Sequence, residues 1–138
     1  MKEVEYRTPN GLHDAYLLGL SVNYRERVLR VDLKWLIGTP GGKTHEAREG
    51  YKAGTLIVSG LRYCVVEAPA QGTGDEPDQI INDFETGLAE IERCNLPDVD
   101  EDTFRHSIYL ALWESFIHFA GTSAEVIPAD LIVREMGQ

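Results

Sequence analysis

Apolar and polar side chains alternate along residues 13–37, on both sides of a charged turn at residues 25–27. The large apolar side chains stand at every second position: Tyr16, Leu18, Leu20, Val22 and Tyr24 before the turn, then Leu29, Val31, Leu33, Trp35 and Ile37. Successive side chains of a β-strand point to opposite faces, whereas a helix needs apolar residues three or four positions apart. The pattern therefore predicts a hairpin of two antiparallel strands, each with one face on a core.

Three later stretches also have β character. Thr55 to Glu67 is dense in β-branched and aromatic residues on both faces, which is typical of a covered central strand, and Gly60 inside it indicates a bulge. Phe104 to Ala120 alternates again and is interrupted near residues 114–115. A last β stretch is predicted over Ala124 to Glu135, broken near its proline.

Between these stretches, the period changes over Asp78 to Arg93. The apolar residues of this segment lie mostly three or four positions apart, which predicts a helix that lays one stripe on the sheet: Ile80, Phe84, Leu88 and Ile91. Asp78 is a residue type that commonly caps a helix N-terminus. The segment is therefore predicted to be a helix from Asp78 to Arg93.

Together these patterns predict an α+β fold: mainly an antiparallel β sheet or sandwich of about six strands, with one helix. Lys2 to Arg7 is predicted as a short edge strand, and the glycine-rich Gly38 to Gly54 as a long loop. No repeat or linker divides the chain, so residues 1–138 are expected to form a single domain.

The composition, 43% apolar and 26% charged, is typical of a globular protein. No run approaches the roughly 18 apolar residues that a membrane helix needs, and residues 1–11 lack the apolar centre of a secretory signal. Cys64 lies in an apolar strand and is interpreted as a core residue. We therefore expect a cytoplasmic protein with reduced cysteines.

Negative charge is concentrated in one segment. Between Asp75 and Asp102 stand eleven acidic residues and one base, Arg93, for a net charge of −10; the other residues hold twelve acids and twelve bases. One interpretation is a solvated helix face that keeps the chain soluble. The other is a surface that attracts a basic protein partner. Nucleic acid and anionic membrane are not expected as partners, because their phosphates would be repelled.

On the second interpretation, the acids of the predicted helix and the following loop form the binding surface. An exposed aromatic side chain is expected beside them as an apolar anchor. The candidate binding residues are Asp83, Glu85, Glu90, Glu92, Asp98, Asp100, Phe104 and Tyr109.

Two loops resemble ligand-binding motifs but lack a residue that the chemistry needs. Residues 38–44 contain the Gly-Lys-Thr of a phosphate-binding loop, yet the first glycine of that motif would have to stand at Ile37. Asp98, Asp100 and Asp102 have the spacing that opens a calcium loop, but neither the glycine nor the closing glutamate follows. Neither loop is therefore expected to hold its ligand.

The four histidines are His13, His45, His106 and His118, and they show no metal-ligand spacing. His106 and His118 are interpreted as packing residues of strands. No serine lies in the Gly-x-Ser-x-Gly setting of a nucleophile elbow. We therefore expect no catalytic residue, no metal site and no cofactor.

The opening pattern, Leu12 to Ala15 followed by the alternating strand and its return strand, resembles the start of several small β-rich bacterial families. Some of these families are similar to immunity proteins of polymorphic toxin systems. Phe116 to Glu135, an aromatic strand with a glycine turn and a short last strand, is compatible with the same layout. The resemblance implies a β-rich protein whose partner is another protein, and it provides no site residues.

Three functions follow as hypotheses. The first is a non-enzymatic binding protein, of immunity type, that uses residues 75–102 against a basic protein. The second is a small-molecule binder or enzyme with a pocket between sheet and helix, where Asp14, His106 or His118 would converge. The third is a structural or oligomeric domain that pairs through its sheet edges.

Overall fold

The computed structural model describes residues 12–36, 51–70 and 78–129. The predicted edge strand at Lys2 to Arg7, most of the predicted loop at Gly38 to Gly54 and the end of the last predicted stretch, residues 130–135, lie outside these ranges. No helix among the described residues has the length and apolar character needed to cross a membrane.

The described residues form a single antiparallel sheet of eight strands in the order β4-β7-β6-β5-β1-β2-β3-β8. The strands and the helix are β1 (Tyr16–Asn23), β2 (Val28–Leu36), β3 (Tyr51–Ser59), β4 (Tyr63–Val66), β5 (Asp78–Glu85), α2 (Leu88–Cys94), β6 (Phe104–Leu110), β7 (Phe116–Gly121) and β8 (Ser123–Pro128). The mainly antiparallel fold with a helix is confirmed, with eight strands instead of about six.

The predicted hairpin is β1 and β2, which pair antiparallel along their length. An irregularity between Leu17 and Gly19 shifts the register, so that Leu18 is an extra residue and is 46% exposed. The face of β1 changes at this bulge: Leu17 lies opposite Leu33, and Leu20 lies opposite Val31. Strict alternation along β1 was therefore wrong at its start, because a bulge reverses the side on which each residue lies.

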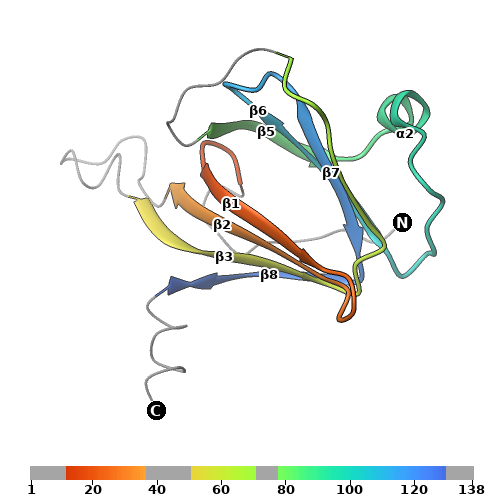
Figure 1. Cartoon of the computed structure of the whole chain (residues 1–138), viewed down its shortest axis with the longest axis horizontal. Coiled ribbons are helices and arrows are strands. Elements are labelled where there is room, and N and C mark those ends of the chain that lie inside the picture. Colours follow the sequence, from red (N-terminus) through yellow and green to blue (C-terminus); the bar gives the residue numbers. More distant parts are fainter. Residues whose placement is uncertain (1–11, 37–50, 71–77, 130–138) are drawn as a thin grey trace.

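The sheet bends so that its two halves face each other, with β5, β6 and β7 on one side and β1, β2, β3 and β8 on the other (Figure 1). The bend lies where β3 passes into β4 at Gly60 and β7 passes into β8 at Gly121. Gly60 has φ of 61°, and a Cβ there would stand 2.1 Å from Oγ1 of Thr122. The predicted single strand over residues 55–67 is therefore two strands, and its glycine is a corner between them.

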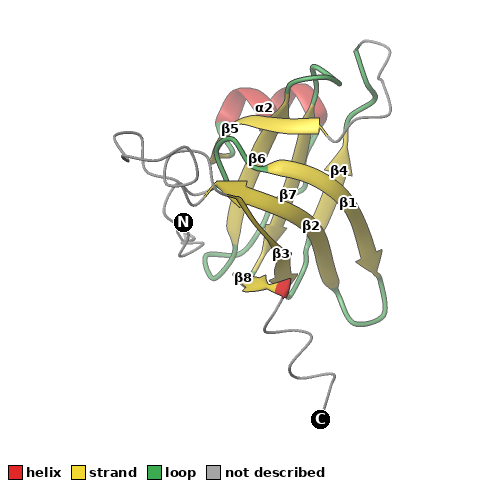
Figure 2. Cartoon of the chain, turned by 90° about the vertical axis from the view of Figure 1, so that its left-hand side faces the viewer, coloured by secondary structure: helices red, strands yellow, loops and turns green. Residues whose placement is uncertain are grey.

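The main core lies between the two halves and takes residues from both: Leu29, Val31, Leu33, Trp35, Leu56, Val58, Ile80, Phe104, Ile108, Leu110, Ile117 and Phe119 are among its buried members. A second, smaller cluster is built around Tyr63, Leu96 and Ala120, with Val65, Ile91, Cys94 and Val99 packed against them. Helix α2 and the loop after it supply four of these residues, so they cover the outer face of the β4–β7 part of the sheet (Figure 2).

The predicted helix over Asp78 to Arg93 was wrong in its first half, because residues 78–85 are strand β5. Asp78 is buried and accepts hydrogen bonds from the backbone N–H groups of Leu112 and Trp113, at 2.6 and 3.0 Å. Ile80 is buried in the core, whereas Leu88 is 70% exposed. Pairing of β5 with β1 and β6 overrides the helical spacing of its apolar residues.

Candidate functional site

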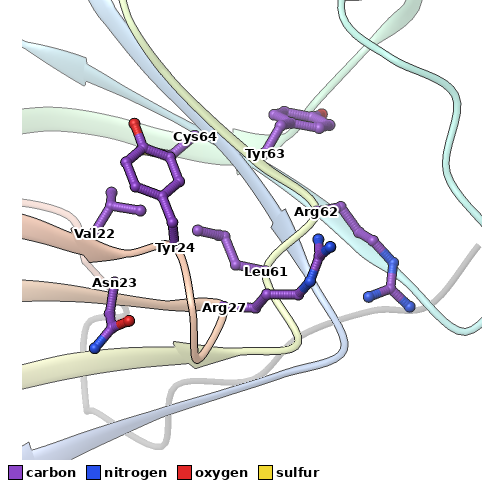
Figure 3. Close-up of a pocket in the computed structure, with 8 residues that line it drawn as sticks. All are labelled: Val22, Asn23, Tyr24, Arg27, Leu61, Arg62, Tyr63 and Cys64. Carbon is purple, nitrogen blue, oxygen red and sulfur yellow. The ribbon is translucent and has the colours of Figure 1, made fainter.

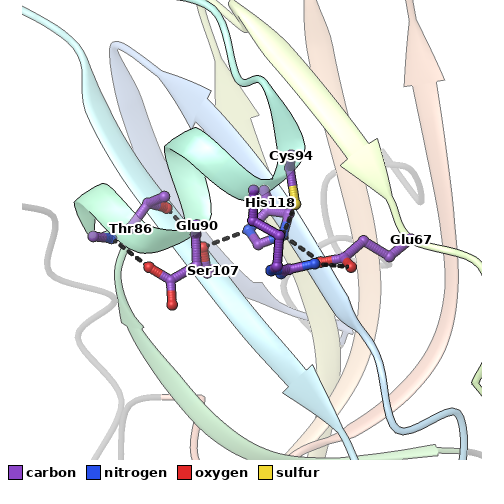
Figure 4. A network of polar contacts seen from close by, with 8 residues as sticks. Glu67, Thr86, Glu90, Cys94, Ser107 and His118 are labelled. Carbon is purple, nitrogen blue, oxygen red and sulfur yellow. Dashed lines mark hydrogen bonds and ion pairs between the residues drawn. The ribbon is translucent and has the colours of Figure 1, made fainter.

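A polar network occupies the outer face of the sheet beneath helix α2 (Figure 4). Its members come from separate parts of the chain: Glu67 follows β4, Thr86 follows β5, Arg93 and Cys94 lie in α2, Ser107 lies in β6 and His118 lies in β7. Ser107 and His118 are directly opposite in the register of β6 and β7, so both side chains lie on the same face. The fold thus brings chemically active side chains together from positions 67–118.

His118 is the centre of the network and is fully buried. Its Nε2 atom lies 2.6 Å from Oε2 of Glu67, and its Nδ1 atom lies 2.7 Å from Oγ of Ser107. The Ser107 hydroxyl shares a further hydrogen bond of 2.7 Å with Oγ1 of Thr86. Hydroxyl groups donate or accept, so this pair of hydroxyls can serve either tautomer of the imidazole.

Glu67 is held from its other side by Arg93, which donates to both carboxylate oxygens at 2.7 and 2.9 Å. The hydrogen bond from Arg93, together with that from His118, lowers the pKa of Glu67 from 4.5 to about 2 although burial opposes the shift. The Arg93 guanidinium also lies 5.4 Å from the ring centre of Phe116, which stacks on His118. The carboxylate is therefore ionised and fixed between a cation and an imidazole.

Cys94, the last residue of α2, places its Sγ atom 3.6 Å from Nε2 of His118. Burial, followed by the charge of Glu67, raises the pKa of the Cys94 thiol. Such a thiol is protonated near neutral pH and is a weak nucleophile, because the thiolate is the reactive form.

The network lacks an accessible nucleophile in the position that a catalytic triad requires. In a triad, one ring nitrogen meets the nucleophile and the other meets the orienting acid. Cys94 and Glu67 meet the same nitrogen of His118, so the thiol is not in the position of a triad nucleophile. Ser107 does lie on the opposite nitrogen from Glu67, but it is fully buried, so a substrate cannot reach its hydroxyl. The arrangement does bring together a carboxylate oxygen, a thiol sulfur and an imidazole nitrogen within 4.8 Å of one another, all of them possible metal ligands.

The predicted acidic residues divide into two groups. Asp83 lies 3.3 Å from His106, and Glu90 accepts a hydrogen bond from the backbone N–H of Gly87 at the start of α2. The remaining four predicted acids are exposed on one continuous part of the chain, from the end of β5 through α2 into the next loop: Glu85, Glu92, Asp98 and Asp100. Asp78, counted in the acidic segment, is buried and does not belong to this surface.

The predicted aromatic anchors lie elsewhere than expected. Phe104 is 1% exposed and packs in the main core, in T-shaped contact with Phe119. The expectation that Phe104 is an exposed anchor was therefore wrong, since its side of β6 faces the core. Tyr109 lies on the other face of β6, partly exposed and 4.8 Å from the ring centre of Phe116.

A pocket of about 120 Å³ lies where the β1–β2 turn meets the β3–β4 corner, lined in part by Tyr24 and Tyr63 (Figure 3). Asp14, His106 and His118 do not line it. His106 lies opposite Phe119 on the core face, whereas His118 lies on the outer face. His106 and His118 therefore lie on opposite faces of the sheet, and neither they nor Asp14 line this pocket.

Sequence reasoning did not find Glu67 or Cys94, because the network joins residues far apart in the chain through strand register. No short motif contains any two of its three possible metal ligands. The only available signal was the alternation of side chains along β6 and β7, which places Ser107 and His118 on one face once the two strands are paired.

Comparison of the chain with protein-family models, with curated proteins and with solved structures gives no match.

Proposed function

We propose that this chain is a non-enzymatic binding protein that presents residues 85–102 to a basic protein partner. The observation that carries this proposal is the set of exposed carboxylates in α2 and the following loop: Glu92, Asp98, Asp100, Glu101 and Asp102. Among the described residues, none of these five is paired with a lysine or arginine.

The two basic side chains nearest in sequence leave this acidic surface uncompensated. Arg93 is engaged by Glu67, and Arg105 is buried and donates from NH2 to the backbone carbonyl of Pro97 at 2.6 Å. Both guanidinium groups therefore hold the segment onto the sheet instead of neutralising its outward carboxylates. The outward charge remains available to attract cationic groups of a partner.

Leu88 supports the proposal with an apolar contact point beside the acids. It is the first residue of α2 and is 70% exposed, although apolar side chains of a short helix on a sheet are usually turned to the core. Interfaces combine a desolvated apolar centre with a polar rim that steers and orients the partner. In this proposal Leu88 takes the anchoring role that the sequence analysis gave to Phe104 or Tyr109.

An immunity-type protein is the most concrete version of this function. Its partner would be a toxin domain with a basic surface, and the acidic surface would speed the encounter and fix the orientation. This version depends on the identity of the partner, which the product of a neighbouring gene would supply.

The test is to purify the products of the neighbouring genes and to measure their dissociation constants for this chain by calorimetry. One basic product is expected to bind. The double variant Glu92→Lys, Asp100→Lys is expected to bind it about tenfold more weakly or worse, because each reversal inverts an exposed contact worth up to about 1 kcal/mol.

The matched control is the double variant Glu26→Lys, Glu125→Lys. Both residues are exposed and lie in the other half of the molecule, at the β1–β2 turn and in β8, so the change in net charge is the same. It should bind like the unmodified protein. Equal weakening by both double variants would show an effect of net charge alone, and no binding by any product would remove the proposal.

A further inference from the structure

We infer that Glu67, Cys94 and His118 form a binding site for one divalent transition-metal ion, with zinc as the ion that the ligands fit best. The site lies between α2 and the outer face of the sheet, beneath the proposed binding surface but on different side chains (Figure 4). The three ligand atoms are a carboxylate oxygen, the thiol sulfur and the Nε2 nitrogen of the imidazole, all within 4.8 Å of one another.

The ligand types select the class of metal. Calcium and magnesium require oxygen ligands, whereas sulfur and imidazole nitrogen together favour zinc and related transition metals. Zinc sites with three protein ligands leave a fourth position for water or a small ligand. Glu67 is partly exposed at 21% of its side chain, so this fourth position can be reached from solvent.

The distances are compatible with a tetrahedral ion. With Zn–N and Zn–S bonds of about 2.05 and 2.3 Å, nitrogen and sulfur ligands of a tetrahedral ion stand about 3.6 Å apart. The observed distance from Sγ of Cys94 to Nε2 of His118 is 3.6 Å. Glu67 now lies 2.6 Å from Nε2 and would have to move away by roughly 0.7 Å to reach the corresponding nitrogen–oxygen distance of about 3.3 Å.

The second ring nitrogen of His118 is already oriented for metal binding. Metal-binding histidines usually donate their other N–H to a hydrogen-bond acceptor, which fixes the tautomer and the ring plane. Nδ1 of His118 has such an acceptor in Ser107, which Thr86 supports in turn. Metal binding would displace the proton through which Nε2 now donates to Glu67. With the remaining ring proton on Nδ1, the lone pair of Nε2 would be directed to an ion held between Cys94 and Glu67.

Arg93 holds the carboxylate without preventing this role. Glu67 has two oxygens, and the metal needs only Oε2, while Arg93 can keep its 2.7 Å hydrogen bond to Oε1. The Arg93 side chain is 50% exposed, so it can follow a small shift of the carboxylate. The divalent cation is matched by the Glu67 carboxylate and by the thiolate that Cys94 becomes when it releases its proton, while Arg93 leaves the site with one net positive charge.

The test uses the full chain, stripped of metal by a chelator, and titrates it with Zn²⁺ by calorimetry and with Co²⁺ by absorption spectroscopy. We expect one ion per chain and a sulfur-to-cobalt charge-transfer band. Cys94→Ser should abolish that band and weaken Zn²⁺ binding about 100-fold or more, and Ser107→Ala, which removes the positioning hydroxyl, should weaken it about 10- to 100-fold.

Cys64→Ser is the matched control, because Cys64 packs against the main core on the opposite face of β4. It should keep both the cobalt band and the zinc affinity. Zinc binding that survives both Cys94→Ser and Glu67→Gln would place the ion at other carboxylates and overturn the inference. Absence of stoichiometric binding by the folded, unmodified chain would overturn it as well.

Discussion

Asp78 tests the fold, because a buried position at the start of strand β5 and an exposed position at the start of a helix predict different losses in the free energy of unfolding. In the structure its carboxylate is buried and accepts two backbone hydrogen bonds, from Leu112 at 2.6 Å and from Trp113 at 3.0 Å. These bonds tie the start of β5 to the turn between β6 and β7. Replacing Asp78 by Ala removes both bonds and leaves two N–H groups without this acceptor.

The expected loss follows from these contacts. A net hydrogen bond to a charged group contributes about 1.5–3 kcal/mol, so the loss of two lowers the free energy of unfolding by about 3–6 kcal/mol. An exposed helix N-cap would contribute only about 0.5–2 kcal/mol. The larger value is a substantial part of the roughly 5–15 kcal/mol that stabilises a typical domain.

Urea unfolding followed by circular dichroism measures this loss. Asp98→Ala is the control, because Asp98 is exposed and should change stability by less than about 0.5 kcal/mol. Asp78→Asn should give an intermediate loss, since the amide keeps one acceptor oxygen but carries no charge. A loss below about 1 kcal/mol for Asp78→Ala, with an unchanged denaturant slope, would contradict the assignment of residues 78–85 to a strand that begins with a buried Asp78.

Three further predictions concern the network, the corner and the helix. The lowered pKa of Glu67 stabilises the fold above pH 4.5, and this contribution should be lost as the pH falls toward about 2. The unfolding midpoints of the unmodified protein and of Glu67→Gln should therefore approach each other as the pH is lowered across that range. Gly60→Ala should cost at least about 1 kcal/mol in thermal unfolding, owing to its positive φ and a close contact, while Gly19→Ala, whose added Cβ has space, should cost less. Ile80→Ala should lower the free energy of unfolding by about 2–5 kcal/mol in urea, and Leu88→Ala by less than about 0.5 kcal/mol. A larger loss for Leu88→Ala than for Ile80→Ala would instead support the predicted helix from Asp78 to Arg93.

The sequence predicted those parts of the fold in which each strand contacts the core in a regular way. β2 is the clearest case: Leu29, Val31, Leu33 and Trp35 alternate with charged residues, and all four are buried. The interruption near residues 114–115 also corresponds to the observed turn, since β6 ends at Leu110 and β7 begins at Phe116. Local periodicity is sufficient to predict a strand where one of its faces is exposed to solvent and the other packs on the core.

The same reasoning failed where tertiary contacts decide the local structure. Residues 78–85 have apolar spacing compatible with a helix, yet β1 pairs with Asp78 and Gln79 and β6 pairs with the rest of the segment, which makes it a strand. The network around His118 could not be predicted from the sequence either, because the residues that meet there depend on the pairing of β6, β7 and β4 and on where α2 ends. Such sites become visible only when register and element boundaries are known.

The most direct test of the proposed function is the salt dependence of the association rate constant with the basic product of a neighbouring gene. Electrostatic steering by the acidic surface predicts a rate that falls steeply as ionic strength rises, and a flatter dependence for Glu92→Lys, Asp100→Lys than for the control pair Glu26→Lys, Glu125→Lys. A rate that does not change with salt, or a slope identical in the two double variants, would contradict recognition through residues 85–102.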